Sequence, residues 1–323
     1  MVLLAVVLLT QSGPGPSRPP AGAGTGSGTN AGRALDPAKF ATGACVEYPP
    51  LRGGRHTTVF LDAGHGGRDP GAVGTTESGS TIEEAQETLP VELDAARLLR
   101  QDGFTVVVSR TAQTTVLRLG PADVAGGELS LLGAHDDVTA RDQCANMAHA
   151  SVLVGIYFDS GASPSNAGSV TVYDTARPFA ARNQRLATLL QRDVLSAMNA
   201  RGWGIPDEGT LPDNNFGSVV QSSSPSPLAT AAANYDHLLL LGPAQAGYFS
   251  TPSEMPGAVI EPLFITDPFE GTLAASPAGQ QTIAGGIAKA VEQYFGGSGP
   301  SRSAKAKRTG SAGRGRTGPV GRT

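Results

Sequence analysis

Short apolar runs that alternate with stretches of helical periodicity constrain the fold of this chain more than any other feature. Apolar runs of strand length occupy residues 58–61, 105–109, 151–158, 169–173, 238–241 and 258–264. Apolar residues recur at helical spacing between and after them, at 91–101, 138–149, 179–201 and 279–295. Because continuous apolar strands are buried on both faces, the pattern is typical of a parallel sheet. We therefore expect one α/β domain with a mainly parallel, roughly six-stranded sheet covered by helices on both faces.

The two ends of the chain differ in composition from the part between them. Residues 2–9 read VLLAVVLL, an apolar run that is too short to span a bilayer but has the length of a signal-peptide core. We assign 1–40 to a signal-like segment and linker, 41–296 to the α/β domain and 297–323 to a basic disordered tail. We expect a secreted or cell-envelope protein, with weak membrane retention through the apolar segment where that segment is not cleaved.

The distribution of charge argues against nucleic acid as a partner. Residues 297–323 hold seven basic residues and no acidic one, which leaves 17 basic and 28 acidic residues in the rest of the chain. The body of the protein therefore has a net charge near −11 and repels a polyanion. We expect no nucleic-acid partner for the domain, which we take to be a monomer. The basic tail is either a solvated segment or a contact for a polyanion.

The two cysteines, Cys45 and Cys144, are an even number in a chain that we expect to be exported. One disulfide between them would close a loop of about 100 residues and tie the start of the domain to a later helix. Two buried free thiols are the alternative.

A glycine-rich turn follows the first strand of the pattern. The segment 59–74 reads VFLDAGHGGRDPGAVG, so Asp62 and His65 lie at the carboxyl end of a buried strand. Open α/β sheets bind their ligands at this end of the strands. The turn does not match a phosphate-binding Walker loop, because no Lys followed by Ser or Thr comes after it.

A glutamate interrupts the last apolar strand. Glu261 lies inside the sequence AVIEPLFI, where an unpaired carboxylate would lose several kcal/mol of hydration free energy. Such a residue needs either a salt-bridge partner at the strand end or a chemical task. A metal ion with its bound water would make Glu261 useful as a general base.

Four segments, taken in order, make the chain resemble the zinc-dependent N-acetylmuramoyl-L-alanine amidases. The first two are VFLDAGHGGRDPGAVG and EAQETLPVELDAARLLRQDGFTVVVSRT, which are similar to the family's first metal-histidine segment and to its glutamate, helix and strand. The other two are ARDQCANMAHASVLVGI, which resembles the element before the next strand, and AVIEPLFITDPFEG, which resembles the catalytic segment. The resemblance covers residues 57–296, nearly the whole domain.

The resemblance implies a hydrolase that cleaves the amide bond between the lactyl group of MurNAc and L-alanine in peptidoglycan. It implies that His65 and Glu84 bind Zn²⁺, and that Glu261 takes a proton from the attacking water and passes it to the leaving amine. This chemistry needs no serine or cysteine nucleophile, and the sequence has no G-x-S-x-G elbow.

One ligand position departs from the family pattern. The family has a further histidine ligand at the end of the third strand, where this chain reads GIYFDSG and places Tyr157. A neutral phenol with a pKa near 10 is a poor zinc ligand unless the ion deprotonates it. His237, which precedes an apolar run that we expect beside the strand of Glu261, is the alternative third ligand.

The position of the ligand glutamate also has alternatives. Pro90 follows Glu84 closely and predicts a helix that begins later than usual, with Glu84 in a loop. Glu83 or Glu87 would then take its place.

The sequence is therefore compatible with two functions. The first is a metal-dependent amidase. The second is an amidase-like protein that binds peptidoglycan or regulates cell-wall metabolism without cleaving it, because loss of a metal ligand lowers metal affinity.

Overall fold

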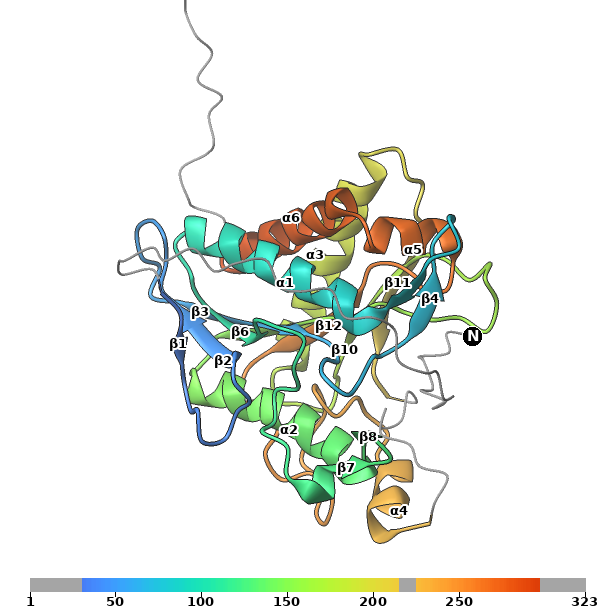
Figure 1. Ribbon diagram of the computed structural model, residues 1–323. Coiled ribbons are helices and arrows are strands. Elements are labelled where there is room, and N and C mark those ends of the chain that lie inside the picture. The colour runs from blue at the N-terminus through green and yellow to red at the C-terminus, as the bar shows by residue number, and fades with distance from the viewer. Residues whose placement is uncertain (1–30, 215–224, 297–323) are drawn as a thin grey trace, which may run out of the picture.

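The computed structural model describes residues 31–214 and 225–296 (Figure 1). Within these ranges, an eight-stranded sheet has the order β1-β2-β6-β3-β9-β12-β10-β11. Its strands are β1 (Arg33–Ala34), β2 (Ala44–Tyr48), β3 (Thr58–Ala63), β6 (Thr105–Arg110), β9 (Val152–Ile156), β10 (Ser169–Tyr173), β11 (Asp207–Pro212) and β12 (Gly257–Glu261). Two small antiparallel pairs lie outside this sheet, β4 (Val73–Thr75) with β5 (Thr81–Glu83) and β7 (Val124–Ala125) with β8 (Glu128–Leu129).

The centre of the sheet is parallel, which confirms the predicted fold class. Strands β6, β3, β9 and β12 run in the same direction, and β2 and β10 flank them in the opposite direction. The sheet is wider than the six strands expected. The edge strands β1 and β11 have no fully buried residue, and β2 is buried only over its first three residues, so their sequences lack the continuous apolar pattern.

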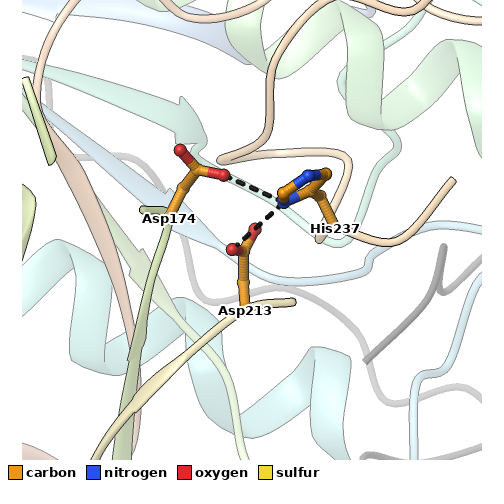
Figure 2. Close-up of side chains that lie close together, drawn as sticks. All are labelled: Asp174, Asp213 and His237. Carbon is orange, nitrogen blue, oxygen red and sulfur yellow. Dashed lines mark hydrogen bonds and ion pairs between the residues drawn. The ribbon is translucent and has the colours of Figure 1, made fainter. Parts of the chain in front are cut away.

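The predicted strand at 238–241 is wrong. Leu238 begins a turn in which its carbonyl accepts hydrogen bonds from the N–H groups of Leu241 and Gly242. The four leucines are buried, so the run is apolar because it fills the core and not because it pairs in the sheet. His237, just before this turn, lies beside Asp174 and Asp213 at the ends of β10 and β11 (Figure 2).

Helices cover both faces of the sheet (Figure 1). On one face lie α1 (Glu84–Gln101), α3 (Ala180–Asn199) and α6 (Pro277–Tyr294), and on the other lies α2 (Leu131–Met147) with the short α4 (Pro227–Ala233) beyond it. The remaining elements are α5 (Pro268–Ala274) and a 3₁₀ turn at Pro121–Asp123. Alternate side chains of β3 point to opposite faces of the sheet, and each face has its own hydrophobic core. Val59 and Leu61 pack with α1 on one face, and Phe60 packs with α2 on the other.

Helix α1 begins at Glu84, earlier than Pro90 predicted. Tertiary contacts set this start: the N–H groups of Glu84 and Ala85 donate to the carbonyls of Ala72 and Pro70. Pro90 lies inside the helix, where it removes one N–H donor. The expectation that Glu84 lies in a loop was therefore wrong, and the first turn of α1 is held against the loop that follows β3.

The predicted disulfide is present. Cys45 in β2 and Cys144 in α2 are joined, with their Cα atoms 5.7 Å apart and a separation of 99 positions in sequence. Both residues are fully buried. The crosslink ties the antiparallel edge of the sheet to the helix that covers its second face.

The assignments of residues 1–30 and 297–323 lie outside the described residues. Strand β1 and the buried Phe40 both lie ahead of the boundary expected at residue 41. In the part of the chain that the structure describes, no helix combines the length and the apolar character needed to cross a bilayer.

A buried glutamate in α1 makes the stability of the fold depend on pH. Glu92 Oε1 accepts hydrogen bonds from Ser109 N and Oγ at 2.7 and 3.0 Å, while Oε2 has no partner. Burial raises the pKa of Glu92 from 4.5 to about 8. Because the folded state then holds this proton more tightly than the unfolded chain, the free energy of unfolding should fall as pH rises from about 4.5 to about 8.

Glu92→Gln keeps the acceptor oxygen and removes the titration. The variant should therefore gain stability relative to the wild type across that interval, by up to about 1.4 kcal/mol per pH unit. Urea unfolding at a series of pH values measures the difference. Parallel curves for the two proteins would contradict the assignment.

Candidate active site

The turn after β3 holds His65 in a backbone conformation that few residues other than glycine adopt. The φ angle of His65 is +61°, and Gly66 and Gly67 next to it also have positive φ. Gly71 leaves room for a close approach, since a Cβ atom there would lie 2.7 Å from Glu84 Oε2 and from His65 Cδ2. The glycines therefore allow His65 and Glu84 to meet.

The imidazole of His65 lies between two carboxylates. Its Nδ1 is 2.8 Å from Asp69 Oδ2, and its Nε2 is 3.2 Å from Glu84 Oε2. Burial lowers the pKa of His65, but the charges of Asp69 and Glu84 outweigh burial and raise the pKa well above 6.5. Asp69 fixes the orientation of the ring and leaves Nε2 directed at Glu84.

Glu84 is anchored by backbone donors on two sides. Its Oε1 accepts a hydrogen bond from Phe158 N, and its Oε2 accepts one from Ala72 N, both at 2.9 Å. The side chain is 2% exposed. Glu84 thus links the turn after β3 to the chain that leaves β9.

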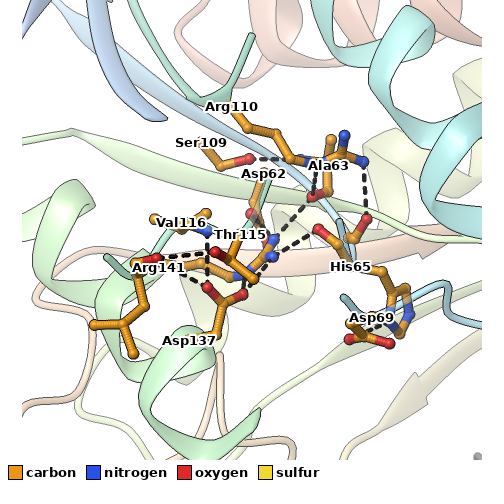
Figure 3. Close-up of polar contacts among 12 residues, drawn as sticks. Asp62, Ala63, His65, Asp69, Ser109, Arg110, Thr115, Val116, Asp137 and Arg141 are labelled. Atoms are coloured by element: carbon orange, nitrogen blue, oxygen red, sulfur yellow. Dashed lines mark hydrogen bonds and ion pairs between the residues drawn. The ribbon is translucent and has the colours of Figure 1, made fainter. Parts of the chain in front are cut away.

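Two buried arginines hold the turn in place (Figure 3). Arg141 of α2 donates to Asp62 Oδ1 at 2.6 Å and to the carbonyl of His65 at 2.8 Å. Arg110, at the end of β6, donates to the carbonyl of Gly64 at 3.1 Å. These charge-assisted bonds satisfy carbonyl groups that the turn takes out of the sheet, and they make the position of His65 rigid.

A second pair of carboxyl groups lies next to His65 and Glu84. Glu261, the last residue of β12, is 4% exposed, and within the part of the chain that the structure describes no N–H group donates a hydrogen bond to its Oε2. Asp159 follows β9 and pairs with Phe264 in a parallel bridge, which brings its side chain beside Glu261. Burial first, and then the charges of Asp159 and Glu84, raise the pKa of Glu261 well above 4.5, while the charge of His65 lowers it.

The hydroxyl of Tyr157 is engaged in a hydrogen bond with Asp62. It donates to Asp62 Oδ2 at 3.1 Å, and its ring packs against Gly64 and edge-on to His65, with ring centroids 5.3 Å apart. Burial and then the charge of Asp62 raise the pKa of Tyr157 well above 10. The hydroxyl therefore acts as a hydrogen-bond donor that positions the carboxylate of Asp62.

A comparison with protein families identifies this arrangement. Residues 59–293 match the family model described as N-acetylmuramoyl-L-alanine amidase. The chain belongs to this amidase family. The matched residues contain His65, Glu84, Asp159 and Glu261, so the whole cluster described above lies inside the amidase domain.

Individual amidases are similar to this chain over most of their own length. The germination-specific N-acetylmuramoyl-L-alanine amidase of Bacillus subtilis (strain 168) is 25% identical over 237 residues, which cover 73% of this chain and 79% of that protein. N-acetylmuramoyl-L-alanine amidase AmiA of Escherichia coli (strain K12) is 24% identical over 257 residues, covering 76% and 78%. The crystal structure of N-acetylmuramoyl-L-alanine amidase from Clostridium difficile 630 matches with a TM-score of 0.50 and 25% identity, over 75% of this chain and 98% of that one.

The alternative ligands weighed from the sequence lie away from the amidase cluster. Glu83 Oε2 accepts a hydrogen bond from Gln86, and Glu87 Oε2 accepts one from Gln280. His237 lies beside Asp174 and Asp213. Strand β10 runs antiparallel to β12 with Val170 opposite Glu261, so the end of β10 near His237 is at the opposite edge of the sheet.

Asp159 and the two arginines of the amidase domain were not predicted from the sequence. Asp159 stands directly after the apolar run at 151–158, a position that could have marked it as a strand-end acid like Glu261. Arg110 and Arg141 carried no such signal, because an arginine beside a strand or within a helix is usually exposed.

His65 and Glu84 offer two ligand atoms 3.2 Å apart to a divalent cation, as expected for a family that is generally metal-dependent. His65 has the carboxylate partner on Nδ1 that metal-binding histidines commonly have, which frees Nε2. Glu84, Asp159 and Glu261 are buried carboxyl groups, Asp159 and Glu261 contact each other, and among the described residues no N–H group donates to Asp159 Oδ2 or Glu261 Oε2. A cation would supply the positive charge that these buried oxygens lack.

Proposed function

We propose that this chain is a zinc-dependent amidase that hydrolyses the bond between MurNAc and L-alanine in peptidoglycan. His65 and Glu84 would hold the zinc ion, with Asp159 in place of Tyr157 as the third ligand. Glu261 would act as the general base. The proposal rests chiefly on one observation: the buried carboxyl group of Glu261 lies at the end of β12, in contact with Asp159 and within the electrostatic reach of His65 and Glu84.

Each residue has a defined task in this scheme. A bound zinc ion would lower the pKa of a water molecule to about 7 and polarise the scissile carbonyl. Glu261 accepts the proton of the attacking water at Oε2 and delivers it to the leaving amine of L-alanine. Asp69 keeps the ring of His65 oriented, and Arg141 keeps the turn that carries His65 in place.

The location of peptidoglycan determines where this protein acts. Peptidoglycan lies outside the cytoplasmic membrane, so we place the protein in the cell envelope or the medium. The disulfide between Cys45 and Cys144 supports this proposal, because disulfides persist in oxidising compartments.

Two substitutions separate Asp159 from Tyr157 as the third ligand. Asp159→Asn should weaken zinc binding by at least about tenfold, the cost that even the loss of a residue supporting a ligand can have. Tyr157→Phe should leave zinc affinity unchanged, because it removes only the hydrogen bond to Asp62. Isothermal titration of the chelator-treated proteins with Zn²⁺ measures both affinities. The opposite result, with Tyr157→Phe losing zinc and Asp159→Asn keeping it, would assign the third ligand to Tyr157.

Tyr157 also favours a second candidate function, peptidoglycan binding without cleavage. The two functions can be distinguished by incubating the wild type and Tyr157→His separately with purified peptidoglycan in the presence of Zn²⁺ and measuring release of stem peptides. If the chain is the proposed enzyme, the wild type itself releases stem peptides. If release and zinc binding occur only in Tyr157→His, the natural chain is a binding protein.

A further inference from the structure

A second group of ligand-type side chains lies at the opposite edge of the sheet from Glu261. Asp174 follows β10, Asp213 follows β11, and His237 precedes the buried turn at 238–241 (Figure 2). One ligand atom from each lies within 4.8 Å of the others. Asp174 comes four residues after Val170, which pairs with Glu261, so a strand rise of about 3.4 Å places it about 13 Å along the sheet.

The two aspartates are positioned by the backbone. Asp174 Oδ1 accepts hydrogen bonds from Ala176 N and Arg177 N at 2.9 and 2.7 Å, and Asp213 Oδ2 accepts one from Leu238 N at 3.2 Å. The other oxygen of each carboxylate is directed at His237 Nδ1, Asp174 Oδ2 at 3.0 Å and Asp213 Oδ1 at 3.3 Å. These two oxygens therefore converge on His237 Nδ1 (Figure 2).

The charge at this point is not balanced by the surrounding side chains. Both aspartate side chains are completely buried, and among the described residues Asp174 Oδ2 accepts no hydrogen bond, although His237 Nδ1 lies 3.0 Å from it. Arg177, the cation on the neighbouring turn, donates its guanidinium hydrogen bonds to the carbonyls of Gly242 and Ser253. A single imidazole therefore faces two buried carboxylates, whose burial without a full counter-charge is costly.

We propose that Asp174, Asp213 and His237 form a second zinc site, separate from the active site. One imidazole nitrogen and two carboxylate oxygens are a donor set that suits Zn²⁺, whereas Mg²⁺ and Ca²⁺ prefer oxygen ligands alone. Three protein ligands leave a fourth tetrahedral position for water. The side chain of His237 is 19% exposed, which gives the ion access to the site from solvent. The ion joins the ends of β10 and β11 to the turn at 238–241.

The test removes the active-site ligand first, so that the result does not depend on the proposed amidase chemistry. Full-length chain with His65→Ala is treated with chelator and titrated with Zn²⁺ in a calorimeter, with Mg²⁺ present as a competitor. We expect one Zn²⁺ per chain, which Mg²⁺ does not displace. Adding His237→Gln should weaken this binding at least about tenfold, whereas adding His56→Gln, a change at an exposed histidine, should leave it unchanged.

Thermal unfolding gives a second readout that does not depend on activity. Zn²⁺ should raise the unfolding temperature of His65→Ala and should not raise that of His65→Ala with His237→Gln. The proposal is overturned if His65→Ala binds no zinc, or if His237→Gln leaves its zinc affinity unchanged. In either case the three residues form an ion pair between a histidine and two aspartates.

Discussion

Glu261→Gln is expected to lower kcat for release of stem peptides from peptidoglycan by about 10²- to 10⁴-fold, the usual contribution of a general base. Glutamine has nearly the same shape as glutamate but cannot accept the proton of the attacking water. Because the substitution keeps the size of this buried side chain, the variant should fold as the wild type does. The measurement is the rate at which new amino termini of L-alanine form.

Glu87→Gln is the matched control for this experiment. Glu87 is also a partly buried glutamate whose pKa burial raises, in this case to about 7, but it contacts Gln280 and not His65. It should keep nearly the full rate. A Glu261→Gln variant that keeps a rate within about threefold of the wild type would remove Glu261 from the mechanism.

Loss of the disulfide should cause the largest change in stability. Replacement of both Cys45 and Cys144 by alanine removes the crosslink. The unfolded chain then gains conformational freedom over the 99 positions that the crosslink had constrained. Loop-closure entropy for a loop of that length predicts a loss of roughly 4–5 kcal/mol in the free energy of unfolding. Urea denaturation with linear extrapolation measures it.

The single variants provide the internal check. Cys45→Ala and Cys144→Ala each remove the whole crosslink, so each should lose most of what the double variant loses. A double variant within about 1 kcal/mol of the wild type would show that the crosslink adds little to stability.

The central part of the fold could be predicted because its strands are buried on both faces. Continuous apolar runs such as those at 58–61 and 151–158 indicated parallel strands, and the strands found there, β3 and β9, lie at the centre of the sheet. Strand β11 was missed because it is an edge strand with no fully buried residue. The run at 238–241 wrongly indicated a strand, since a short apolar segment has the same composition in a buried turn as in a strand.

The candidate site was predicted in part. His65 was marked by its place at the carboxyl end of a buried strand and Glu261 by its charge within an apolar strand, and the structure brings them to the same edge of the sheet. The start of α1 at Glu84 could not be predicted, because Pro90 is a local signal and the helix start depends on contacts with Pro70 and Ala72. The direction of the Tyr157 hydroxyl depends on Asp62, which lies 95 residues away in sequence.

Anomalous diffraction at the zinc edge, from crystals of the full-length protein grown with Zn²⁺, tests the central claim most directly. The account predicts a zinc peak bonded to His65 Nε2 and to an oxygen of Glu84 at about 2.0–2.2 Å, with Glu261 in hydrogen-bond reach of a solvent molecule on the ion. No peak at His65, or a peak whose solvent ligand lies out of reach of Glu261, would contradict it.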